Sequence, residues 1–68
     1  MRLHLEDRLI DKLEALPETG MGFQRVDLVL RDGRVVRDVI VFNAEEAEVP
    51  DEGLRADQIA DVQLSQRR

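Results

Sequence analysis

The first quarter of the chain carries apolar residues at the spacing of a helix. They recur every three or four positions and leave the opposite side charged; they are Leu5, Leu9, Ile10, Leu13 and Leu16. This period predicts an amphipathic α-helix over residues 5–16, which Pro17 ends because proline has no amide hydrogen. A helix of this length is marginal alone in water. We therefore expect its leucine stripe to pack on the sheet that follows, or on the same sheet of another subunit.

The middle of the chain changes to a period of two and becomes rich in valine. Alternation of apolar and polar residues is typical of half-buried strands, and it predicts two of them, over residues 24–31 and 34–42. Asp32-Gly33 stands between them and is a common hairpin turn. The sequence therefore predicts an antiparallel hairpin.

The charges on this hairpin favour one register. A two-residue loop would set Asp27 opposite Asp38, two like charges, whereas a three-residue loop ending with Gly33 in the left-handed conformation pairs Asp27 with Arg37. We prefer the second register. It places most apolar residues on one face, with Asp38 out of pattern: Val26, Leu28, Leu30, Val36, Ile40 and Phe42. Further valines fall on the opposite face and need cover from the helix or a second subunit: Val29, Val35, Val39 and Val41.

The rest of the chain predicts three short elements. Residues 45–49 have the pattern of a strand, residues 56–60 that of a single helical turn, and residues 61–65 that of a final strand. We therefore expect a single domain over residues 1–68. Its fold class is mainly β with an N-terminal α-helix, and its sheet is a small, partly open barrel of about four to five antiparallel strands.

Two segments give this order of elements a resemblance to known proteins. Val26–Arg34 is similar to the first motif of the Sm-like proteins, and Leu54–Ile59 is more loosely similar to the second. The resemblance implies a small SH3-like (Sm-like) barrel. The RNA-contacting Asp and Asn of the family would fall on Ala44 and Glu48, and Asp38 stands where the family has Gly. The resemblance therefore extends to the barrel and not to the RNA site.

Length and composition narrow the ways in which the chain can be stabilised. At 68 residues it buries only about 60% of its unfolded surface. It contains no Cys and one His, so disulfides and the usual zinc sites are excluded. Association with further copies of the chain would bury additional apolar surface, so we expect a homo-oligomer.

The charge balance bears on the choice of partner. A net charge of −5 opposes binding to a phosphate backbone, so nucleic acid is not the expected partner. Arginines nonetheless gather around the predicted turn, where they are either a basic patch for RNA or an acidic partner, or ordinary solvated charges: Arg25, Arg31 and Arg34. No apolar run is long enough for a membrane span and no signal peptide is recognisable, so we expect a cytoplasmic protein that does not enter a membrane.

Few residues offer chemistry. The hydroxyl groups of Thr19 and Ser65 and the imidazole of His4 do not form a nucleophilic pattern, and we expect no catalytic residues and no cofactor. The acidic run Glu45–Glu52 lacks the alternating ligands and central Gly of a calcium loop. We expect a solvated edge strand there, whose charges block edge-to-edge pairing, rather than a metal site.

These observations favour a non-enzymatic interaction module that assembles through apolar surface. The candidate interface combines the helix stripe with the second hairpin face: Leu5, Leu9, Leu13, Val29, Val39 and Val41. One alternative is an Sm-like RNA-binding ring protein, and a second is a metal-dependent accessory subunit resting on the acidic run.

Overall fold

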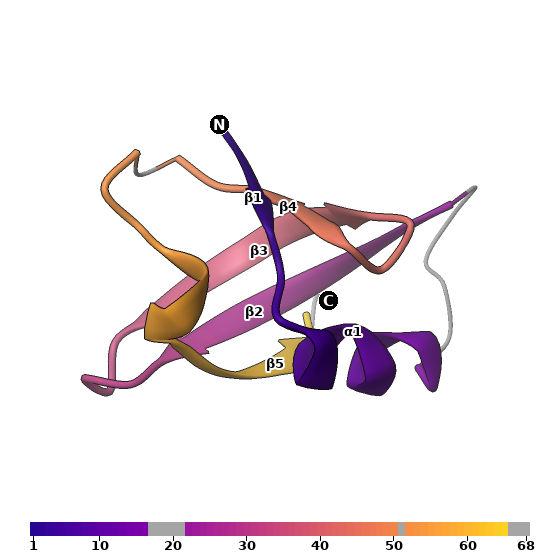
Figure 1. Ribbon diagram of the computed structural model, residues 1–68, viewed down its shortest axis with the longest axis horizontal. Coiled ribbons are helices and arrows are strands. Elements are labelled where there is room, and N and C mark those ends of the chain that lie inside the picture. The colour runs from indigo at the N-terminus through magenta and orange to yellow at the C-terminus, as the bar shows by residue number, and fades with distance from the viewer. Residues whose placement is uncertain (17–21, 51, 66–68) are drawn as a thin grey trace.

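The computed structural model describes residues 1–16, 22–50 and 52–65. In chain order its elements are β1 (Arg2–His4), α1 (Asp7–Glu14), β2 (Phe23–Leu30), β3 (Val35–Phe42), β4 (Glu46–Glu48), the 3-10 turn η1 (Ala56–Gln58) and β5 (Ile59–Leu64). The five strands form one antiparallel sheet in the order β1-β4-β3-β2-β5 (Figure 1). The sheet is not closed, because β1 and β5 lie at its two edges. The prediction of a mainly β chain with an N-terminal helix is confirmed.

The N-terminal strand β1 is not predicted by the sequence pattern. It pairs with β4, and the amide of Leu5 extends the ladder by donating to the carbonyl of Glu45 at 2.8 Å. Leu5 therefore belongs to the sheet, and the helix begins at Asp7, two residues later than predicted. The helix ends at Glu14, two residues before the predicted end, and Pro17 lies outside the described residues.

The hairpin of β2 and β3 has the predicted three-residue register. Leu28 lies opposite Val36, and Val29 lies opposite Val35. The amide of Gly33 donates to the carbonyl of Leu30 at 3.0 Å, and Gly33 has a φ of +95°, in the left-handed region that glycine adopts without strain.

A β-bulge interrupts this register in the middle of β3. Asp38 has a φ of +61°, and its amide donates to the Asp27 carboxylate at 2.9 Å, so Arg37 and Asp38 together face Asp27. One extra residue in a strand of period two turns every later side chain to the other face. The predicted faces are therefore wrong beyond Asp38: Val39 and Val41 enter the core, whereas Ile40 and Phe42 turn outward.

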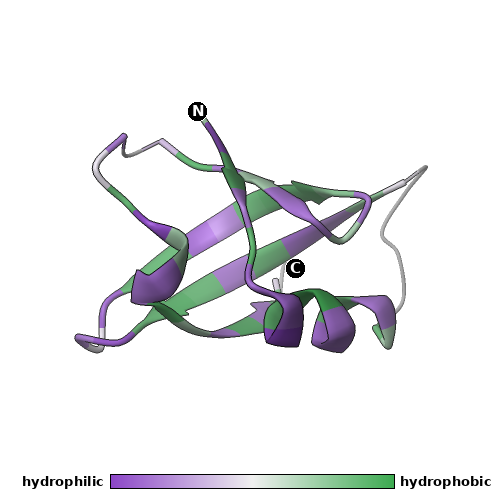
Figure 2. Ribbon diagram, viewed as in Figure 1, coloured by the Kyte–Doolittle hydropathy of each residue, from purple (hydrophilic) through white to green (hydrophobic). Residues whose placement is uncertain are grey.

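The core lies between α1 and the inner face of the sheet. β3 is apolar on both sides of a charged middle (Figure 2), and the apolar residues on the inner face of β2 and β3 are nearly inaccessible except Val36, which is partly buried. The buried apolar residues are Leu5, Leu9, Leu13, Val26, Leu28, Leu30, Val39, Val41, Ala47, Val49, Leu54, Ile59 and Val62. The leucine stripe of the helix thus packs on the sheet of its own chain, the first of the two predicted arrangements.

Polar contacts fasten α1 to the edge strand β5. The guanidinium of Arg8 donates to the carbonyls of Ile59 and Ala60 at 2.6 and 2.9 Å. The ammonium of Lys12 donates to the Asp61 carboxylate at 2.6 Å. An exposed edge strand offers unpaired backbone groups to other strands. Arg8 occupies two of the carbonyls of β5 and so shields part of this edge.

A buried glutamine closes the other end of the helix. The Gln24 side chain is 3% exposed, and its Nε2 donates to the carbonyls of Leu13 and Leu16 at 3.0 and 3.3 Å. The last carbonyls of a helix have no partner within it. The Leu13 carbonyl accepts the amide of Leu16 at 3.0 Å, and Gln24 adds a side-chain donor from β2 to the carbonyls of both residues, which explains a polar residue at an inner position of that strand.

Candidate interaction surfaces

Most of the predicted interface residues are buried in the structure. Leu5, Leu9, Leu13, Val39 and Val41 are all 3% exposed or less, because the helix stripe closes the chain's own core and the bulge turns the two valines inward. These five are therefore corrected from candidate interface to core. Val29 alone stays partly exposed, on the side of the sheet that faces away from the core.

That side, here called the outer face, is formed by β2 and β3. Its apolar members are Phe23, Val29, Val35, Ile40 and Phe42. Phe23 lies opposite Phe42 at one end of the hairpin, and Val29 opposite Val35 at the other. Val35 is 41% exposed and the other four are partly exposed. The sequence missed Ile40 and Phe42 because their face depends on the bulge, whose one signal is the charge of Asp38 at an apolar position.

Charged residues occupy the centre of the outer face and neutralise one another. Arg25 Nη1 lies 3.2 Å from an Asp38 carboxylate oxygen, and Arg37 Nη1 lies 3.7 Å from Asp27. Two arginines and two aspartates give this face no net charge. The outer face is thus apolar at both ends and charged but neutral in the middle.

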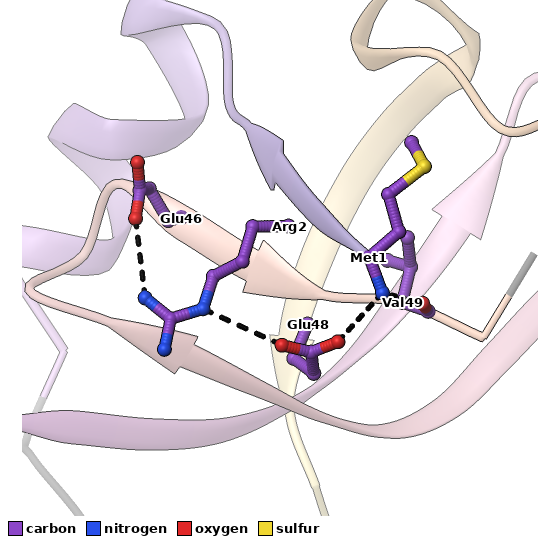
Figure 3. A network of polar contacts seen from close by, with 5 residues as sticks. All are labelled: Met1, Arg2, Glu46, Glu48 and Val49. Atoms are coloured by element: carbon purple, nitrogen blue, oxygen red, sulfur yellow. Dashed lines mark hydrogen bonds and ion pairs between the residues drawn. The ribbon is translucent and has the colours of Figure 1, made fainter. Parts of the chain in front are cut away.

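A second polar cluster joins β1 to β4 (Figure 3). Arg2 lies 3.3 Å from Glu46 and 3.4 Å from Glu48, and the Met1 amino group donates to Glu48 at 2.7 Å. The Arg2 guanidinium also lies 4.1 Å from the centre of the Phe42 ring, a cation–π distance. The hydrogen bond from the terminal ammonium holds the pKa of Glu48 below its usual value, despite some desolvation.

Two carboxylates of the acidic run therefore already have cationic partners. Glu46 and Glu48 are occupied by Arg2 and the amino terminus rather than turned toward each other. Within residues 1–16, 22–50 and 52–65, no three metal-ligating side chains converge. The prediction of an edge strand here is wrong, because β4 pairs on both sides, with β1 and with β3, and β1 is the edge of the sheet.

The predicted basic patch divides into two places. Arg25 lies on the outer face with Asp38, whereas Arg31 and Arg34 line a pocket of about 210 Å³ at the turn of the hairpin. The complete lining is Leu30, Arg31, Asp32, Arg34, Arg55, Asp57 and Gln58. Arg55 was not predicted here. It is 21 positions from Arg34 in the sequence, and pairing of β5 with β2 brings it to the turn.

No protein-family model, curated protein or solved structure matches the chain. The Sm-like resemblance of Val26–Arg34 and Leu54–Ile59 therefore stays a prediction. In the described part of the chain, no helix is long and apolar enough to cross a membrane.

Proposed function

We propose that this protein is a non-enzymatic assembly module that pairs with a second copy of itself through the outer face of β2 and β3. The observation that carries the proposal is the combination on one face of five partly exposed apolar side chains with a neutral charged centre. α1 covers the inner face, so the outer face is the side of the hairpin still available to a partner.

Charge favours a second copy as the occupant. The whole chain has a net charge of −5, so two copies repel each other over most of their surface. The outer face is free of this repulsion because Arg25 and Arg37 balance Asp38 and Asp27. Two acidic copies therefore meet there at the lowest electrostatic cost.

The order of groups along the strands is also self-complementary. A two-fold axis between the faces and perpendicular to the strands sets the Phe23/Phe42 end of one copy over the Val29/Val35 end of the other. The same rotation brings the arginines of each centre within reach of the aspartates of its partner. A standard interface of about 800 Å² per partner would cover somewhat under a fifth of the 4511 Å² surface of the chain.

We also propose that the curled sheet is a partly open barrel of SH3-like type. β1 and β5 are its unpaired edges, and α1, which follows β1, contacts β5 through Arg8 and Lys12. The helix thus lies where a barrel would close.

Val35→Lys tests the self-association. This residue is the most exposed apolar member of the outer face, so the charge costs little in folding but lies inside the proposed interface of both copies. Sedimentation over a micromolar to millimolar series is expected to show a dimer for the original chain and a monomer for the variant. The matched control is Ala15→Lys, which adds the same charge at an exposed position at the end of α1. A monomer throughout the series, or a Val35→Lys variant that dimerises like the control, contradicts the proposal.

A further inference from the structure

We propose that the pocket at the turn of the hairpin binds a phosphate-sized oxyanion. Three arginines and two aspartates line it, which leaves one net positive charge in a chain whose total is −5. Its volume of about 210 Å³ is below the roughly 300–1,000 Å³ of pockets for drug-sized ligands. The pocket therefore has the sign and the size for a small anionic group.

Each arginine of the pocket is fixed through one atom. The Nε of Arg31 donates to the Asp57 carbonyl at 2.6 Å, that of Arg34 to the Asp32 carboxylate at 2.7 Å, and that of Arg55 to the Asp57 carboxylate at 3.3 Å. Among the described residues, the Nη nitrogens of all three make no hydrogen bond within the chain. These nitrogens are the donors that bind carboxylate and phosphate in pairs.

Arg31 is the distinctive member of this group. Within the described ranges, every other arginine and the lysine lie within 4 Å of a carboxylate, whereas Arg31 bonds only to a main-chain carbonyl. Its charge is thus held in place at the pocket without a counter-ion. A bound oxyanion would supply one.

The two aspartates hold the arginines in position and do not neutralise the positive charge of the pocket. Asp32 accepts the main-chain amide of Arg34 at 3.0 Å and the Nε of the same residue. The backbone hydrogen bond first, and the guanidinium second, lower the pKa of Asp32, so it stays an acceptor at neutral pH. The Asp32 carboxylate therefore points to Arg34, and its two hydrogen bonds fix the conformation of the turn that carries Arg31 and Arg34.

Titration with inorganic phosphate at constant ionic strength, followed by amide chemical shifts, tests the site. Saturable shifts are expected at residues 30–34 and 55–58, and Arg31→Gln is expected to weaken the affinity by about tenfold or more, since a charged hydrogen-bond donor is lost. Arg31→Lys keeps the charge without the planar fork and is expected to recover only part of it. Lys12→Gln is the control, because it removes an equal charge from α1, away from both the pocket and the outer face.

Titrations with two further anions, glycerol phosphate and acetate, distinguish the kinds of ligand that could carry the anionic group. Inorganic phosphate binding as tightly as glycerol phosphate indicates a free anion, whereas tighter binding of the ester indicates a phosphate carried on a small molecule. Acetate tests whether one carboxylate suffices. Non-saturable shifts with all three anions, or equal weakening by Arg31→Gln and Lys12→Gln, would overturn the proposal, since the effect would then be general screening.

Discussion

Deletion of Asp38 tests the account of the bulge. The residue is the extra one in β3, and removing it lets Arg37 face Asp27 and Val39 face Val26 in a regular ladder. Every later side chain then keeps its present face, so Val39 and Val41 stay in the core. We therefore expect that a residue can be removed from the middle of a central strand without unfolding the chain.

The magnitude follows from what the deletion removes. The chain loses the hydrogen bond from the Asp38 amide to Asp27, of the order of 1.5 kcal/mol, and the exposed Arg25–Asp38 ion pair, about 0.5 kcal/mol. It also loses a non-glycine residue in the left-handed region, and the removal of this strain stabilises the folded chain by about 1–2 kcal/mol. The net change is then within about 1 kcal/mol, a shift of up to about 8 °C in Tm.

Deletion of Val36 is the matched comparison. It can keep Val39 opposite Val26 by placing Arg37 at the inner position opposite Leu28, where a charge has no partner. It can also draw Val35 into that position, but the turn then shortens to Arg31-Asp32, and tight two-residue turns favour a positive φ that these residues adopt only with strain. If the ladder slips instead, Val39 and Val41 leave the core at about 1.5–3 kcal/mol each, a large part of the stability of a small domain. Thermal unfolding followed by circular dichroism should show a cooperative transition for the Asp38 deletion and none for the Val36 deletion. A folded Val36 deletion beside an unfolded Asp38 deletion would refute the bulge reasoning.

Two further predictions concern the attachment of α1. Gln24→Leu, measured by urea unfolding, should lower the free energy of unfolding by about 1–3 kcal/mol, because two hydrogen bonds of about 0.5–1.5 kcal/mol each are lost, to the carbonyls of Leu13 and Leu16. An unchanged midpoint would contradict this role. The hydrogen bond from Lys12 holds the pKa of Asp61 below 3.8, so its stabilisation is present above that pH and is lost on acidification through the lowered pKa of the folded state. Lys12→Met should therefore lower the free energy of unfolding near pH 6 and change it little near pH 2. An equal loss at both pH values would contradict a role for the charge of Lys12.

The sequence predicts the hairpin register because two local rules agree. Asp32-Gly33 specifies the turn, and the charges of Asp27 and Arg37 select the three-residue loop. It does not predict the bulge, since this is a choice of backbone conformation at Asp38 that period-two counting cannot represent. Asp38 stands where the Sm-like pattern has Gly, and its left-handed backbone is one that glycine favours.

The candidate sites were harder to predict than the elements. The outer face depends on the bulge, and the pocket depends on β5 bringing Arg55 beside Arg31, a contact between distant segments. β1 was missed because three residues are too few to show a period, and because Leu5 fits the helical spacing equally well. Local pattern thus predicts which elements form, whereas long-range pairing decides which charges meet.

The central claim, self-association through the outer face, is tested most directly by amide chemical shifts measured during dilution. From millimolar to low micromolar concentration, we predict shifts at Phe23, Val35, Ile40 and Phe42 and none along the exposed side of α1. Their midpoint should coincide with the dimer dissociation seen by sedimentation. Shifts confined to α1, or no shift over the whole range, would contradict the account.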